Sequence, residues 1–406
     1  MKISHSYNIA ILTAILLGSL SGYFSIPFFE HLSSTIITLF LSMLKLISLP
    51  MIFLAIISTM TKMKSLGEAN FLIRKIAKYT LITTILASSI GFFLFHFLRP
   101  TMTIEGMQPE AIPEMSGSYL SFLLKIIPSN PIQPFLENNV LAVTFIAAIL
   151  SIAILKLPEN TSATVKSFFQ GLFEALLKIT SALIFLMPLG IFAFTSHFVR
   201  SIRNDSAILR QIFIYVVCVI GANLIQGLIV LPLLLKIKKI PPSRIARGMF
   251  PALTMAFFSK SSNATLPLSL ECAKNRLKLD EKTVNFSFPL CSVINMNGCA
   301  AFIIITVLFV AVSNGVPYSF LSMLPWIFIS TLAAIGNAGV PMGCFFLTNA
   351  LLTGMKVPLE MMGFIMPLYS LIDMVETALN VWSDGCVTAI VDKEVITAEL
   401  PCPVKI

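Results

Sequence analysis

The chain has 406 residues, of which 56% are hydrophobic and only 12% are charged, and its mean hydropathy is +0.90. Soluble globular proteins carry about 25% charged residues, so the composition excludes that class and predicts an integral membrane protein with room for roughly eight to ten spans. The net charge of +9 does not indicate nucleic-acid binding, because the basic residues are scattered between apolar runs.

Six apolar runs, each long enough to cross a hydrocarbon core of about 30 Å, occupy the first part of the chain. They lie at about 8–27, 33–60, 76–98, 137–156, 172–198 and 209–236. The seven cysteines lie mostly in apolar segments, and the four histidines show no ligand spacing. We therefore expect the cysteines to be small buried side chains, and neither a disulfide framework nor a metal site.

Two apolar stretches beyond residue 240 are interrupted by polar or turn-forming residues. The first is broken by SKSSNAT at 259–265, and the second, at 325–352, by GNAGVPMG at 336–343. Each arm has only about ten to a dozen residues, which is too short to cross a bilayer but suits a re-entrant hairpin. Two further spans, 284–312 with NMNG inside it and 362–391, follow the hairpins. Interrupted elements at corresponding places in two repeats predict a transporter binding site.

The basic residues of the predicted loops set the orientation. With the N-terminus inside, the cytoplasmic segments hold 20 Lys and Arg residues and the outer segments hold 6. The positive-inside rule therefore predicts a multi-pass protein of the cell (inner) membrane with both termini in the cytoplasm. The loop at 199–210, with three arginines outside, counts against this orientation.

A polar stripe marks the last span. At about 100° per residue, Asp373, Thr377, Asn380 and Asp384 fall on one side of a helix, with Glu376 at its edge. A carboxylate that faces lipid is costly, so this stripe must face protein, water or a bound ion.

The interruptions offer different chemistry. A helix that is interrupted at Ser261, Ser262 and Asn263 presents unpaired N–H groups and hydroxyls that can hold a carboxylate; ordinary turn residues facing solvent are the alternative. The asparagines of NMNG and the carbonyls freed beside them suit a hard cation such as Na⁺, and hydrogen bonding across a packed helix interface is the alternative. The acids of the last span are expected to hold an ammonium group or an ion, unless they pair structurally with Lys45 or Lys260.

Six segments resemble, in order, landmarks of the dicarboxylate/amino acid:cation symporter family, the glutamate transporter homologues. They are IIPSNPI (126–132), MPLGIFAF (187–194), SSNATLPLSLECA (261–273), INMNGCA (294–300), NAGVPMG (337–343) and DMVETALNVWSDGCVTAIV (373–391). The resemblance implies an all-α integral membrane fold of eight transmembrane helices plus two re-entrant helical hairpins with inverted repeats. It also implies a homotrimer in the lipid bilayer, an elevator mechanism and no cofactor beyond the coupling ion.

The same resemblance divides the chain into two parts. The scaffold would comprise 1–75 (spans 1 and 2) and 101–200 (spans 4 and 5). The transport domain would comprise span 3 at 76–100 and a core at 201–406, which holds span 6, hairpin 1 at about 246–275, span 7 at about 283–312, hairpin 2 at about 325–352 and span 8 at about 362–392.

The resemblance further implies a role for each matching residue. The substrate carboxylate would be held at the first hairpin tip and by Asn380, the amino group by Asp373, and the second tip would close over both. The expected substrate-binding residues are Ser261, Ser262, Asn263, Cys299, Gly339, Val340, Pro341, Asp373, Glu376, Thr377 and Asn380. The expected Na⁺ ligands are Val293, Asn295, Met296, Asn297, Asn380, Asp384, Thr83 and Thr84, with Thr80 at the third site.

Two departures from the family pattern shape the functional prediction. Asn297 replaces an aspartate at the third cation site, which lowers the expected number of coupled Na⁺ ions or brings in H⁺. Glu376 stands where acidic-substrate members carry an arginine, the natural partner of a second carboxylate. We therefore expect a cation-coupled amino acid symporter, with Na⁺ as the leading ion, for neutral-polar or basic substrates. Glutamate, aspartate or C4-dicarboxylates are the alternative, with Lys260 in the arginine's place.

Two other classes fit less well. A channel would not need two opposed dead-end hairpins. A membrane enzyme is not expected, because the sequence contains no Ser/His/Asp set, H-E-x-x-H motif or P-loop.

Overall fold

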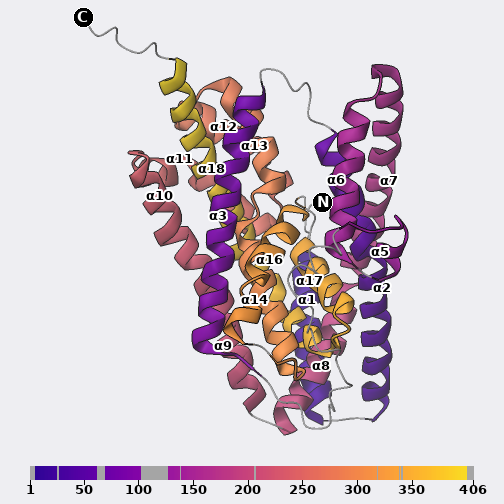
Figure 1. Cartoon of the computed structure of the whole chain (residues 1–406). Helices are drawn as coiled ribbons and strands as arrows, with labels where there is room; N and C mark the ends of the chain where they lie inside the picture. The colour runs from indigo at the N-terminus through magenta and orange to yellow at the C-terminus, as the bar shows by residue number, and fades with distance from the viewer. Residues whose placement is uncertain are drawn as a thin grey trace, which may run out of the picture.

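The computed structural model describes residues 5–24, 27–61, 69–101, 127–137, 139–204, 207–317, 319–337, 339 and 342–399. This part of the chain is helical and contains no strand (Figure 1). The N-terminal helices are α1 (His5–Phe24), α2 (Pro27–Met60), α3 (Ala69–Leu98), α5 (Gln133–Leu136), α6 (Val140–Leu155), α7 (Glu159–Phe185) and α8 (Met187–Asn204). The C-terminal helices are α9 (Ala207–Ile225), the π-helix η1 (Gln226–Val230), α10 (Leu231–Ile237), α11 (Pro242–Ser259), α12 (Ser262–Glu271), the π-helix η2 (Cys272–Arg276), α13 (Glu281–Ile294), α14 (Asn297–Ser313), α15 (Phe320–Met323), α16 (Trp326–Ile335), α17 (Gly343–Gly354) and α18 (Glu360–Glu399).

Within the described residues, five helical segments are long and apolar enough to cross a membrane. They are Pro27–Ser58, Leu72–Leu98, Ile208–Ile237, Glu281–Ser313 and Glu360–Ile396. The bent pair α7 and α8 makes a sixth if it is counted as one span. The structure is therefore that of a multi-pass membrane protein, as the composition predicts.

The apolar run at 172–198 does not form one straight helix. It is divided between α7 and α8, which meet at Leu186 with a bend of 49°. Pro188 explains the break, because proline has no N–H to donate and its ring collides with the carbonyl four residues earlier. The pattern of hydrophobic residues is continuous through this point, so hydropathy alone predicts a single segment.

Helix α14 forms the centre of the core. Every residue from Asn297 to Ala311 is buried, and the helix contacts α3, α9, α16, α17 and α18. A helix that is apolar all round is stable inside a protein core or in a membrane, and α14 is enclosed by its neighbours. Large apolar side chains elsewhere, such as Phe213, Leu228 and Leu371, are exposed on the outside of the described bundle. They form a surface suited to lipid.

The helices fall into two groups by their contacts. In the first, α2 packs on α6, α7 and α8, and α1 packs on α8. In the second, α3 packs on α14, α16 and α9, and α18 packs on α11 and α13. Figure 1 shows α2, α5, α6 and α7 together on one side and α3, α9 and α10 on the other. The groups meet where α17 contacts α2 and α18 contacts α8.

Each group of residues expected to form a hairpin contains two short helices. α11 and α12 pack on each other and are separated by Lys260 and Ser261. α16 and α17 also contact each other, and the segment between them is described only at 336–337, 339 and 342. Val340 and Pro341, both expected to bind substrate, lie outside the described residues.

Candidate functional site

The helix formed by α13 and α14 is broken at Asn295 and Met296. These two residues have φ/ψ of −97°/65° and −101°/64°, well outside the helical region. The break leaves backbone groups at the ends of both helices without helical partners. Gly298, just beyond it, lets α14 approach α18 closely, because a Cβ there would lie 2.8 Å from the Glu376 Cα.

A network of amide, hydroxyl and carboxylate groups fills the space beside this break. Asn295 donates its Nδ2 to the Asp384 Oδ1 at 2.9 Å and accepts at its Oδ1 from the Asn297 Nδ2 at 2.8 Å. Thr83 donates to the same Asn295 oxygen at 3.2 Å, and the Gln226 Nε2 donates to the Asn297 Oδ1 at 2.8 Å. All five residues are buried. Oxygen donors gathered in a dry place are what a hard cation requires.

The other expected cation ligands lie around this network, and the Thr83 hydroxyl also donates to the Thr80 carbonyl at 3.1 Å. Thr84 donates its hydroxyl to the Thr80 carbonyl at 2.7 Å, while the Thr80 hydroxyl is buried without a hydrogen-bond partner in the described part of the chain. Val293 lies in the last turn of α13 and Met296 lies in the break itself, so both can offer backbone carbonyls there.

The two interrupted elements meet at their tips. Lys260 adopts a left-handed conformation (φ 53°) at the end of α11, and Ser261 caps α12 by accepting a bond from the Ala264 N–H at 3.2 Å. Asn263 donates its Nδ2 to the Gly339 carbonyl at 3.2 Å. Gly339 has φ +68°, and a Cβ there would lie 3.0 Å from the Asn263 Nδ2, so glycine suits both the backbone and the contact.

Between these tips and α18 lies a small cavity of about 20 Å³. It is lined by residues from both interrupted elements, from the start of α14 and from α18. The lining residues are Lys260, Ser261, Ser262, Met296, Cys299, Asn337, Gly339, Gly343, Cys344, Tyr369, Asp373, Glu376, Thr377 and Asn380. Among the expected substrate ligands that the structure describes, only Asn263 is not part of this lining.

Two acids of α18 face the cavity with few partners. Asp373 accepts a long bond of 3.4 Å from the Thr377 hydroxyl. Glu376 is 1% exposed, and within the described chain neither of its carboxylate oxygens has a hydrogen-bond partner. The nearby amine of Lys260 donates to the Ser370 hydroxyl at 2.6 Å. The described residues thus contain no ion pair that locks these acids, and the cavity can receive a positively charged group.

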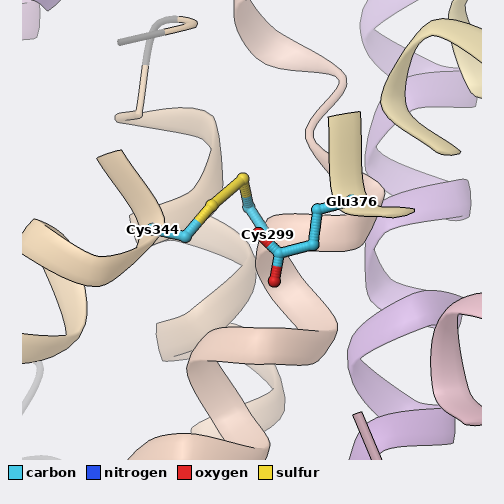
Figure 2. Close-up of side chains that lie close together, drawn as sticks. All are labelled: Cys299, Cys344 and Glu376. Atoms are coloured by element: carbon cyan, nitrogen blue, oxygen red, sulfur yellow. A yellow bond between two sulfur atoms is a disulfide. The ribbon is translucent and has the colours of Figure 1, made fainter. Parts of the chain in front are cut away.

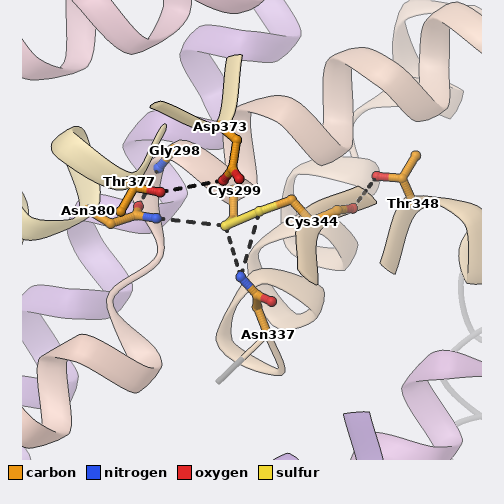
Figure 3. Close-up of a disulfide and its surroundings, with 8 residues drawn as sticks. All are labelled: Gly298, Cys299, Asn337, Cys344, Thr348, Asp373, Thr377 and Asn380. Carbon is orange, nitrogen blue, oxygen red and sulfur yellow. Dashed lines mark hydrogen bonds between the residues drawn. A yellow bond between two sulfur atoms is a disulfide. The ribbon is translucent and has the colours of Figure 1, made fainter. Parts of the chain in front are cut away.

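Asn380 joins the cavity to the polar network. Its Oδ1 accepts from the Gly298 N–H at 2.8 Å, and its Nδ2 faces the Cys299 sulfur at 3.8 Å (Figure 3). Gly298 directly follows Asn297, which belongs to the network. A shift of Asn297 in the network can therefore displace Asn380 in the cavity wall, and the reverse, through the Gly298 N–H.

The expectation that no cysteines form a disulfide is wrong in one place. Cys299 on α14 and Cys344 on α17 are joined by a disulfide in the cavity wall, with their Cα atoms 5.3 Å apart. The sequence did not reveal this pair, because 45 residues separate the two cysteines and only the folding of α17 back onto α14 brings them together. The described cysteines at 218, 272, 291 and 386 are free and buried.

Two further polar residues escaped the sequence reasoning. Gln226 sits in the π-helix η1 and contacts Asn297, although a lone glutamine in an apolar run was its only signal. A π-helical turn often marks a functional position. Asn337, inside the GNAGVPMG interruption, donates its Nδ2 to the Cys299 sulfur at 3.1 Å.

Comparison with known proteins identifies the family of this chain. The model of the sodium:dicarboxylate symporter family matches residues 8–394. An excitatory amino acid transporter 3 from Mus musculus is 32% identical over 257 residues, which cover 63% of this chain and 49% of the relative. A neutral amino acid transporter B(0) from Rattus norvegicus is 24% identical over 377 residues, covering 80% of this chain and 67% of the relative.

An excitatory amino acid transporter from Caenorhabditis elegans is 30% identical over 254 residues, covering 62% of this chain and 50% of the relative. The chain thus spans about half the length of the mouse and nematode relatives. The family and these relatives are transporters and not enzymes. Because the family model covers nearly the whole chain, the protein belongs to the sodium:dicarboxylate symporter family.

Proposed function

We propose that this protein is a secondary active symporter that couples the uptake of an amino acid to Na⁺. The observation that carries the proposal is the bond from the Gly298 N–H to Asn380, which links the cavity to the buried oxygen-rich network. Occupation of the network by a cation and of the cavity by a substrate would then favour each other. Such a coupling free energy is reciprocal, so each ligand would tighten the binding of the other.

The cavity supplies groups for both ends of an amino acid. The N-terminus of α12, with Ser261 and Ser262, presents N–H groups and hydroxyls that suit the α-carboxylate. Asp373 would hold the amino group, and Thr377 lines the same wall. Asn263 and Gly339 would close the cavity where the two tips touch.

The substrate side chain would lie near Glu376. A buried carboxylate without a partner repels a second carboxylate and attracts an ammonium, a guanidinium or a hydrogen-bond donor. We therefore propose neutral-polar or basic amino acids as substrates. The alternative, glutamate, aspartate or a C4-dicarboxylate, is favoured by one observation, the presence of the Lys260 amine in the cavity wall.

The proposed Na⁺ ligands are Asn295, Asp384 and Thr83 in the buried network, with backbone carbonyls at the break in the helix. Asn297 brings an amide instead of a carboxylate to this place. We propose that fewer Na⁺ ions, or an H⁺, accompany the substrate than in members with an aspartate there.

The elevator mechanism and the quaternary structure are also proposals. The separate packing of α1, α2 and α6–α8 on one side and of α3 and α9–α18 on the other supports a scaffold and a transport domain. Movement would then occur where α17 meets α2 and α18 meets α8. The short pairs α11/α12 and α16/α17 would be the two re-entrant hairpins, in a homotrimer of the inner membrane with cytoplasmic termini.

A thermal-shift screen of the purified protein tests the substrate class. A ligand that binds only the folded state raises the melting temperature. Serine or arginine should stabilise the protein in Na⁺ but not in choline, and aspartate should have little effect. Stabilisation by aspartate alone would reject the proposal. If aspartate binding is then lost in Lys260→Ala and kept in Glu376→Gln, the dicarboxylate alternative is supported.

A further inference from the structure

The pair Cys299 and Cys344 forms, with Glu376, a compact cluster in the cavity wall. One ligand atom from each of these residues, the two sulfurs and a carboxylate oxygen, lies within 4.8 Å of the others. All three side chains are buried, and they come from three different helices, α14, α17 and α18 (Figure 2). Two sulfurs and a carboxylate are a ligand set used for thiophilic divalent metals such as Zn²⁺.

The surroundings of the two sulfurs contain groups that suit a bound metal ion. Cys299 lies in the first turn of α14 and Cys344 in the first turn of α17, where the helix dipole stabilises a negative charge. The Asn337 Nδ2 points at both sulfurs, at 3.1 Å from Cys299 and 3.6 Å from Cys344 (Figure 3). Amide donors of this kind orient and hold the ligands of a metal.

Glu376 provides an independent indication that a positive charge belongs here. Its two oxygens are buried and have no hydrogen-bond partner in the described part of the chain. The amide oxygen of Asn337 is likewise buried and unpartnered there. Since such a carboxylate is costly to bury alone, a cation between the sulfurs and Glu376 would satisfy it.

We propose that the reduced cysteine pair binds one Zn²⁺ or Cd²⁺ ion together with Glu376. The structure holds the oxidised pair, so the site forms only after reduction. A phosphine reductant takes up the oxygen of a water molecule and passes two electrons to the S–S bond, which becomes two thiols. The metal ion then displaces the two thiol protons and binds both sulfurs.

This site has a direct consequence for the cavity. The metal would share Glu376 with the proposed substrate site and would tie α17 to α14 and α18. Substrate and metal should therefore exclude each other. Oxidation of the pair removes the metal site, because the sulfurs of a disulfide are no longer thiolates.

A titration with Cd²⁺ tests the proposal. The purified protein is reduced with a phosphine, and the sulfur-to-cadmium charge-transfer absorbance in the ultraviolet is recorded. The reduced protein should bind one Cd²⁺ per chain, and protein reoxidised with diamide should bind none. Cys299→Ser and Cys344→Ser should each weaken binding by at least about tenfold, since even second-shell changes at metal sites cost about 10–100-fold.

Cys218→Ser is the matched control, because Cys218 is buried on α9 and does not line the cavity. It should bind Cd²⁺ as the unchanged protein does. Absence of binding in the reduced protein, or equal binding in the reduced and reoxidised forms, would overturn the proposal without any variant having to fold. The readout is absorbance and not uptake, so its failure would leave the proposed symport activity untouched.

Discussion

The close approach of α14 to α18 at Gly298 predicts a large effect of a single methyl group. In Gly298→Ala the new Cβ would lie 2.8 Å from the Glu376 Cα, 2.9 Å from the Glu376 carbonyl oxygen and 3.0 Å from the Asn223 Oδ1. Two of these atoms belong to backbone and cannot turn aside. Overpacking of this kind costs about 1–3 kcal/mol.

Separation of the helices would also stretch the bond between the Gly298 N–H and Asn380, whose loss costs about 1 kcal/mol. The better helix propensity of alanine returns about 0.5–1 kcal/mol. The net destabilisation is therefore about 1–3 kcal/mol. The melting temperature in detergent measures it, and the stabilisation by Na⁺ plus substrate should fall as well.

Gly171→Ala is the matched control for this substitution. Gly171 lies inside α7, and a Cβ there would have no atom within 4 Å. This change should leave the melting temperature equal or slightly higher. A Gly298→Ala protein as stable as Gly171→Ala, with the same response to Na⁺, would refute the reasoning.

Three further predictions concern charges. Asp384→Asn should abolish stabilisation by Na⁺ in a thermal-shift assay, because the network loses its carboxylate; an unchanged Na⁺ response would place the ion elsewhere. Asn297→Asp should destabilise the Na⁺-free protein, since it buries a charge, and should lower the Na⁺ concentration for half-maximal stabilisation; a higher requirement would contradict this. The Glu394 carboxylate, bonded to Lys238 at 2.7 Å, raises the pKa of that amine above its ordinary 10.5. The ion pair therefore stabilises the fold fully below about pH 10.5, and this stabilisation is lost as the pH rises through the raised pKa of Lys238. Lys238→Met should cost about 0.2–1 kcal/mol at pH 8 and nothing at a pH above that raised pKa. Measuring the free energy of unfolding at pH 8 and above the raised pKa checks this, and an equal cost at both would contradict it.

The sequence predicts the polar stripe of the last span because one helix carries all of it. Asp373, Thr377 and Asn380 are one turn apart and line one cavity in the structure. The break at Asn295 is likewise visible in the sequence, since asparagine and glycine interrupt an apolar run. Local patterns of this kind suffice where neighbouring residues determine the outcome.

Features that depend on distant segments could not be predicted in this way. The pairing of Cys299 with Cys344 requires α17 to fold back on α14, and no periodicity encodes that contact. Gln226 joins the network only because η1 turns its side chain toward Asn297. The bend at Leu186 follows from Pro188. A proline in an apolar run can leave one kinked span or two separate helices, and the packing of distant segments decides between them.

The central claim is that a cation gradient drives an amino acid through the cavity. The most direct measurement is uptake of labelled serine or arginine into liposomes that contain the purified protein and a Na⁺ gradient directed inward. We expect accumulation above the external concentration, and its collapse when a sodium ionophore dissipates the gradient. Entry only to equal concentrations, independent of the gradient, would contradict the account.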